Sequence, residues 1–225
     1  MFFTPLTFLF MLIFFIFLLF FFTLVQINLV ALAFMKIGIP PQHVFTALFA
    51  TLLGSYINIP VKKIPQESMT AERRMSFFGF VYAIPFRRKQ VTVLAVNVGG
   101  AVIPAFISFY LLLKTGLYFQ TFIATIIMSG VCFRLAKPIR GVGIAMPFFV
   151  PPLLAALLSV IIGYDRAPVI AYISGTLGTL IGADILNLKK IRNLGAPVAS
   201  IGGAGTFDGI FLTGILAVIL SAFLT

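Results

Sequence analysis

The acidic residues are the side chains of this sequence that could do chemistry, because they are few and two of them lie inside apolar segments. Against 16 Lys and Arg there are five acids, namely Glu67, Glu72, Asp165, Asp184 and Asp208. Asp165 stands beside Arg166 in a polar break, where a hydrated acid is expected. Asp184 and Asp208 lie in apolar runs, where an unpaired acid costs several kcal/mol. These two residues are the candidate catalytic pair.

Two carboxylates that share a poorly solvated site cannot both ionise easily, so one proton is held between them. The ionised member can take a proton from water as general base, while the protonated member donates to a carbonyl oxygen. Such a pair suits hydrolysis of an amide. Cys132 is the lone cysteine and His43 the lone histidine, so the sequence predicts neither a metal site nor a cofactor.

The elements that must position this pair are membrane helices. Hydrophobic residues make up 61% of the 225 residues and charged residues 9%, which excludes an ordinary soluble domain. We expect an all-α, polytopic transmembrane helix bundle of about seven spans, forming one integral membrane domain over residues 1–225 with a polar cytoplasmic interval at 60–90. The expected spans are 2–33, 44–59, 91–113, 117–133, 143–162, 168–188 and 198–224.

The basic residues set the expected orientation of these spans. In order along the chain, the loops hold one, seven, one, three, one and three Lys or Arg residues. The positive-inside rule places the richer loops in the cytoplasm, with the N-terminus inside and the C-terminus outside. Asp184 and Asp208 then approach the membrane from the cytoplasmic side. Basic clusters between apolar runs do not resemble a nucleic-acid-binding surface, so membrane lipids are the expected partner and nucleic acid is not.

A glycine run at the start of the last span predicts irregular backbone beside the two acids. Gly202, Gly203 and Gly205 weaken a regular helix there, and a partly extended or re-entrant stretch would bring Asp208 towards Asp184. Such backbone survives in a membrane only when it is buried in protein or lines water, so the run implies a cavity. The expected substrate-binding residues on this half of the membrane are Asn58, Asn97, Asn187, Gly203 and Gly205.

Glycines also have a purely structural interpretation in membrane helices. Ser174, Gly178 and Gly182 recur at every fourth residue, which is typical of a helix-packing face. On an ideal helix Asp184 lies about 160° from Gly182, so the packing face and the carboxylate are expected on opposite sides of one helix.

Two resemblances follow from these residues. Over most of its length, especially at 54–60 and 200–214, the sequence resembles a family of uncharacterised prokaryotic membrane proteins known only as a domain of unknown function. That resemblance implies a multi-pass protein of the prokaryotic cytoplasmic membrane and supplies no activity.

A second resemblance covers only about residues 168–214. An inward-running span with one Asp, followed by an outward-running span with an Asp preceded by glycines, is similar to the intramembrane aspartyl proteases of the presenilin, signal peptide peptidase and prepilin peptidase group. In that group Gly-x-Gly directly precedes the second Asp, whereas here Thr206 and Phe207 separate Gly205 from Asp208. The resemblance implies a catalytic Asp184 and Asp208.

The leading hypothesis is therefore an intramembrane aspartyl protease-like hydrolase that acts on a transmembrane peptide or protein substrate. A second hypothesis is a small proton-coupled transporter, because broken helices that carry carboxylates also form ion and substrate sites. A noncatalytic membrane scaffold is the third.

Overall fold

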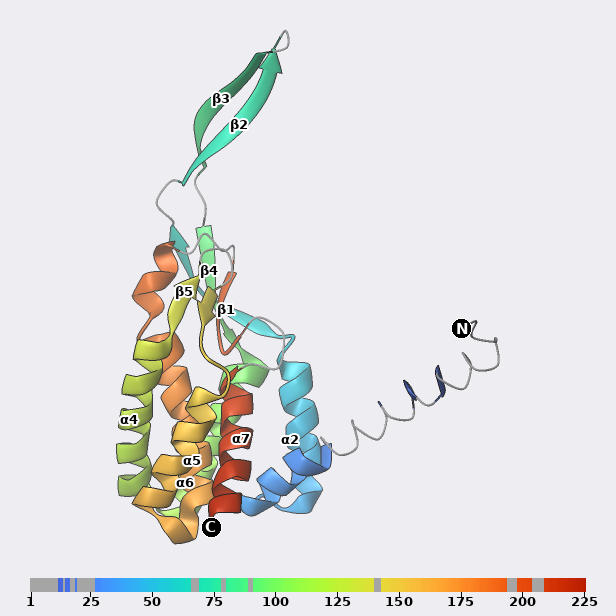
Figure 1. Cartoon of the computed structure of the whole chain (residues 1–225), viewed down its shortest axis with the longest axis vertical. Helices are drawn as coiled ribbons and strands as arrows, with labels where there is room; N and C mark the ends of the chain where they lie inside the picture. Colours follow the sequence, from blue (N-terminus) through green and yellow to red (C-terminus); the bar gives the residue numbers. More distant parts are fainter. Residues whose placement is uncertain are drawn as a thin grey trace, which may run out of the picture.

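The computed structural model describes residues 12–13, 15–16, 19, 27–65, 69–77, 80–88, 91–139, 143–193, 198–203 and 209–225. Within these ranges only the backbone is described at 69–77, 80–88, 143 and 191–193. The described chain is mostly helical, and its helices pack side by side with short strands gathered at one end (Figure 1). Asp208 and Gly205 lie outside the described residues.

Within the described ranges, seven α-helices make up most of this bundle. They are Ile27–Lys36, α2 (Pro41–Gly54), α3 (Ile103–Thr115), α4 (Tyr118–Leu135), α5 (Val150–Ile162), α6 (Ala167–Thr179) and α7 (Gly209–Leu224). Two short π-helices, η1 (Val98–Val102) and η3 (Leu180–Ile185), continue α3 and α6 at the end where the strands lie. Two 3-10 helices, η2 (Tyr164–Arg166) and η4 (Leu188–Asn193), flank α6 and η3.

Membrane-spanning length is reached by only some of these helices. Within the described part of the chain, three helical stretches are long and apolar enough to cross a membrane: Val98–Thr115, Tyr118–Leu135 and Tyr164–Lys190. The helix Ile27–Lys36 and α2 pass the same test together, with a bend of 119° between them. The apolar helices α5 and α7, with 13 and 16 residues, are shorter. The structure thus has the character of a membrane protein.

The described chain is mostly helical, as expected, but it is not all-α, because strands replace the ends of several expected spans. The strands β1 (Asn58–Pro65), β4 (Val91–Asn97) and β7 (Val198–Ile201) form a sheet in the order β1-β4-β7. β4 runs antiparallel to β1 and parallel to β7. Two hairpins join them at this end of the bundle: β2 (Met69–Phe77) with β3 (Phe80–Arg88), and β5 (Lys137–Ile139) with β6 (Gly143–Ala145).

The break after the helix Ile27–Lys36 follows from a glycine cap. Gly38 has a φ of +87°, and the Gly38 and Ile39 amides donate to the carbonyl oxygens of Met35 and Phe34 at 2.9 and 3.0 Å. These two bonds form a Schellman motif, which satisfies carbonyls that a helix end leaves open. Ile39 and Phe34 are both buried in one cluster, which completes the hydrophobic contact of the motif.

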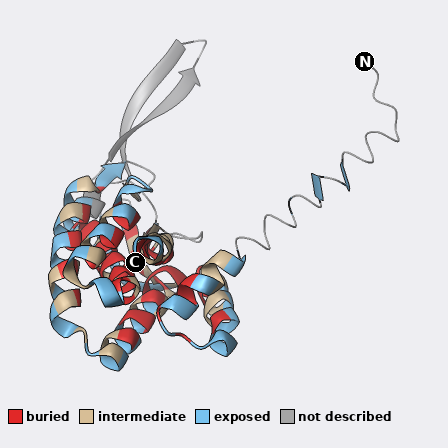
Figure 2. Cartoon of the chain, turned by 60° about the horizontal axis from the view of Figure 1, so that its bottom comes forward, coloured by how far each residue is buried: buried red, intermediate tan, exposed pale blue. Residues whose placement is uncertain are grey.

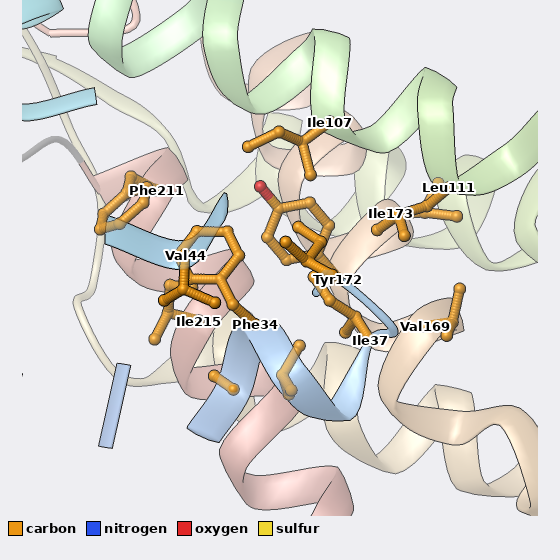
Figure 3. Packing of buried hydrophobic residues seen from close by; sticks show 13 residues of the cluster. Phe34, Ile37, Val44, Ile107, Leu111, Val169, Tyr172, Ile173, Phe211 and Ile215 are labelled. Carbon is orange, nitrogen blue, oxygen red and sulfur yellow. The ribbon is translucent and has the colours of Figure 1, made fainter. Parts of the chain in front are cut away.

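The main core lies where this bent segment meets α3, α6 and α7 (Figure 3). The ring of Phe34 lies 6.4 Å from those of Tyr172 and Phe211, measured between centroids. Ile107 and Leu111 of α3 close the cluster. Buried residues lie on the inner faces of the helices and exposed residues face outwards (Figure 2). Many exposed residues are large and apolar, such as Phe106 and Phe119 at 72% exposure each, which suits contact with lipid tails.

Helix α6 lies at the centre of the bundle, and its small residues allow close approach to α4. A Cβ added at Gly178 would collide with Met128, and one added at Gly182 would lie 2.8 Å from the Cβ of Cys132. The packing face expected from the spacing of Ser174, Gly178 and Gly182 is therefore confirmed for the two glycines. Because these glycines face α4, the opposite side of the helix, which carries Asp184, faces away from α4.

Candidate functional site

Asp184 lies in the π-helix η3, where α6 loses regular α-helical geometry. Its carboxylate is half-buried, and its Oδ2 atom accepts a hydrogen bond from the backbone amide of Gly202 at 2.8 Å. Short π-helical turns inside longer helices are frequent at functional sites. The hydrogen bond ties the end of the sixth expected span to the start of the seventh.

Gly202 is held in a position that only glycine fits. Both Gly202 and Gly203 have positive φ, +85° and +83°, a region that side chains other than glycine adopt at a cost. A Cβ at Gly202 would lie 2.6 Å from the Ala101 nitrogen and 2.8 Å from the Gly100 carbonyl carbon. The turn after β7 is thus pressed against η1 on one side and bonded to η3 on the other. The irregular backbone expected from the glycine run is confirmed at residues 198–203.

Asp184 also lines a pocket of about 210 Å³ at the sheet end of the bundle. The walls come from the segment before α5, from the junction of α6 with η3, and from the start of α7. The lining residues are Ile144, Met146, Pro147, Phe148, Thr179, Ala183, Asp184, Gly209, Ile210 and Thr213. Gly209 is the residue that follows Asp208 in the sequence, so described residues from both expected catalytic segments line one pocket.

Asn58 and Asn97 are brought together, and they meet Ser200 as well. The Nδ2 of Asn97 donates to Ser55 O at 2.6 Å and to Asn58 Oδ1 at 3.1 Å, while Ser200 Oγ donates to Asn58 Oδ1 at 2.5 Å. The Asn97 Oδ1 accepts from the Gly100 amide at 2.7 Å and so caps η1. Because Asn97 is buried and both of its amide hydrogens are bonded within the chain, its geometry favours a structural role over substrate binding.

Asn187 is also buried at the end of η3. Its Nδ2 donates to the carbonyl oxygens of Gly182 and Ala183, each at 3.0 Å. Its Oδ1 has no hydrogen-bond partner among the described residues. The side chain therefore holds the turn that carries Asp184, one helical turn away from the carboxylate.

Sequence reasoning missed several residues of this site. Ser200 and Thr213 were not singled out, although Ser200 bonds to Asn58 and Thr213 lines the pocket. Thr179 lines the pocket and contacts the Cys132 sulfur at 3.6 Å. Hydroxyl residues are common in membrane helices, so their spacing alone carries little signal. No group of three His, Cys, Asp or Glu side chains that could hold a metal occurs within the described ranges.

Comparison with known proteins identifies a family. A family described as "Protein of unknown function (DUF1614)" matches residues 52–220, a range that contains η1, η3, β7 and the pocket walls. This confirms the expected likeness to an uncharacterised family. No curated protein and no solved structure matches the chain. The resemblance to intramembrane aspartyl proteases stays a prediction.

Proposed function

Because the chain belongs to the DUF1614 family, whose description carries no activity, we propose a function from the site itself: an intramembrane aspartyl protease-like hydrolase with Asp184 and Asp208 as its catalytic pair. The observation that carries this proposal is the pocket that Asp184 shares with Gly209, the neighbour of Asp208. A pocket of about 210 Å³ has room for several water molecules, at about 30 Å³ each. Hydrolysis needs such water beside the acids.

The hydrogen bond from Gly202 to Asp184 supports one division of roles between the two acids in this proposal. A backbone N–H that donates to a carboxylate stabilises its negative charge, and Asp184 receives this bond at Oδ2. Asp184 is then the general base that takes a proton from water, and Asp208 is the general acid that protonates the carbonyl oxygen of the scissile amide. The tetrahedral intermediate collapses as Asp184 gives its proton to the leaving nitrogen and Asp208 takes a proton back from a hydroxyl of the intermediate. These two transfers restore the starting protonation state of the pair.

An edge strand beside the pocket supports a peptide as the substrate. β7 lies at one edge of the three-stranded sheet and leads directly to Gly202. An extended peptide can add to such an edge through backbone hydrogen bonds. A transmembrane segment that unwinds next to β7 would present a peptide bond to the pocket. In this proposal the substrate-binding residues are Asn58, Asn187, Gly203 and Gly205. Asn97 holds Asn58 through the hydrogen bond from its Nδ2.

The proposed setting is a multi-pass protein of the prokaryotic cytoplasmic membrane, with about seven spans, the N-terminus inside and the C-terminus outside. The loops support this setting, because the loops rich in Lys and Arg lie at one end of the bundle and the loops with one cation each lie at the other. Leu188 of η4 and Ile144 of β6 pack against the sheet at one end, which gathers three cation-rich loops there. Lys36, Lys114 and Arg166, from the three loops with one cation each, line one pocket at the other end.

The test is cleavage of a transmembrane reporter by purified protein in proteoliposomes. We expect Asp184→Asn and Asp208→Asn each to lower the cleavage rate by about 10²–10⁴-fold, the usual contribution of general acid–base catalysis. Asp184→Asn can still accept the Gly202 hydrogen bond through its amide oxygen, so its unfolding transition should match that of the wild type. Asp165→Asn is the matched control, because Asp165 lies at the other end of the bundle. Cleavage that survives in both variants would overturn the proposal.

A proton-coupled carrier is the second candidate, and the two π-helices favour it. η1 begins one spanning helix and η3 interrupts another, and Gly202 contacts both of them. Discontinuous helices beside a carboxylate form ion sites in transporters. Wild-type protein without cleavage activity, together with uptake into liposomes that follows a proton gradient, would favour this alternative.

A further inference from the structure

Three cations from three separate elements meet in a pocket at the end of the bundle opposite Asp184. Lys36 ends the first described helix, Lys114 lies in the last turn of α3, and Arg166 belongs to η2. All three line a pocket of about 450 Å³, and its other described lining residues carry no charge. Residues far apart in the sequence are thus brought together around one space.

One of these cations is fixed by contacts within the chain. The Lys114 Nζ donates to the carbonyl oxygen of Gly38 at 2.7 Å and lies 5.6 Å from the ring centroid of Tyr110. An ammonium group has three donors, so donors remain for a ligand after the bond to Gly38. The Schellman turn that directs the Gly38 carbonyl therefore also sets the place of Lys114.

The charge around this space is unbalanced. A neighbouring pocket of about 350 Å³ is also lined by Lys36 and Arg166, and Asp165 is the only acid among the described lining residues of the two pockets. Among the described side chains that line the two pockets, three are cationic and one is a carboxylate, which leaves a side-chain charge of +2. Like charges that face the same space are stabilised by an anion between them.

The tyrosines near this pocket indicate that it lies at the level of lipid headgroups. Tyr110, Tyr118 and Tyr164 lie at the same helix ends and are 45%, 54% and 55% exposed. Tyrosine is enriched where a membrane protein meets the boundary between hydrocarbon and water. Leu113 and Phe119 beside them are each 72% exposed and apolar, which suits contact with lipid tails. A ligand at this level can carry both an anionic group and an acyl chain.

The geometry points to a binding site for the phosphate group of an anionic phospholipid, held by Lys36, Lys114 and Arg166. The guanidinium of Arg166 can bind two phosphate oxygens at once, and the two lysines contribute charge. The acyl chains would lie along the exposed apolar face of α3 and the start of α4. The site is separate from the Asp184 pocket and does not depend on the proposed function.

The test measures lipid binding to purified full-length protein in neutral detergent. Native mass spectrometry and thermal unfolding would compare phosphatidylglycerol, phosphatidylcholine and inorganic phosphate. We expect the wild type to retain phosphatidylglycerol and to gain thermal stability from it in preference to phosphatidylcholine. The combined Lys36→Gln, Lys114→Gln and Arg166→Gln variant should bind phosphatidylglycerol about 100-fold more weakly, since each cation near an anionic lipid contributes about fivefold.

The matched control removes three exposed cations at the sheet end, through Arg134→Gln, Lys137→Gln and Lys189→Gln. It should bind like the wild type. Should the first triple variant fail to fold, Arg166→Gln alone serves, with an expected loss of about fivefold. Equal weakening in the control, unchanged binding in the Arg166 variant, or inorganic phosphate that stabilises as well as phosphatidylglycerol would each overturn the assignment to a lipid phosphate.

Discussion

Gly202→Ala is the substitution whose effect can be worked out most closely from the structure. The new Cβ would lie 2.6 Å from the Ala101 nitrogen, 2.7 Å from the Ala101 Cβ and 2.8 Å from the Gly100 carbonyl carbon. Optimal contacts between carbon atoms are about 3.5–4.0 Å. Either the turn after β7 or the π-helix η1 must therefore move, and both are backbone, which cannot yield as a flexible side chain can.

Two costs add in this variant. The φ of +85° at Gly202 costs alanine about 1–2 kcal/mol. Overpacking against backbone costs about 1–3 kcal/mol. We therefore expect the free energy of unfolding to fall by about 2–5 kcal/mol. Displacement of the Gly202 amide also disturbs its bond to Asp184, so reporter cleavage should fall in the fraction of protein that stays folded.

The assay is reversible chemical unfolding in mixed micelles, followed by circular dichroism. Gly130→Ala is the control, because Gly130 lies in α4 with no contact for an added Cβ within 4 Å. It should be neutral or stabilising by up to about 1 kcal/mol, the difference in helix propensity. If Gly202→Ala unfolds within about 0.5 kcal/mol of the wild type, the usual range for a neutral surface change, the turn is not held as we describe.

Three further predictions concern packing and topology. Asn97→Ala removes the cap of η1 and two other hydrogen bonds, so unfolding should become easier by about 2–4 kcal/mol; a change below about 0.5 kcal/mol would contradict the described network. Gly182→Ala places a Cβ 2.8 Å from that of Cys132 and should cost about 1–3 kcal/mol, whereas unchanged stability would mean that α4 and α6 can separate freely. In intact cells, a cysteine introduced at Lys190 should be shielded from an impermeant reagent and one at Thr225 should be labelled, with little background because Cys132 is buried. A shielded Thr225 position would reverse the proposed orientation.

Features that depend on local sequence were predictable from it. Gly38 with the prolines that follow it marked the end of a helix, and the structure ends one at Lys36. The four-residue spacing of Gly178 and Gly182 indicated a packing face, and these glycines meet α4. The glycine run marked irregular backbone, which the structure shows at Gly202 and Gly203. Each of these signals needs only a few neighbouring residues.

The strands were not predictable by the same means. Val91–Asn97 is apolar and runs without a polar break into the helical stretch Val98–Thr115, so hydropathy reads both as one span. β-branched residues at 91–93 favour a strand, but a short apolar run does not distinguish strand from helix. Residues 91–97 form a strand because they pair with β1 and β7, and both of these partners are distant in sequence. Asn97 is a similar case. The sequence predicts a substrate residue there, but its hydrogen bonds to Ser55 and Asn58, which are distant in sequence, and its cap on η1 give it a structural role.

The parallel pairing of β4 with β7 bears on how the protein is made. Val93 pairs with Val198, 105 residues later in the chain. At a synthesis rate of roughly 5–20 residues per second, about 5–20 s pass between the synthesis of β4 and that of its second partner, β7. Throughout that time one edge of β4 has polar backbone groups without their final partners. The nascent chain must shelter this edge from lipid and from other strands, so the sheet closes late, and the Gly202 contact with Asp184 forms only after most of the bundle has been inserted.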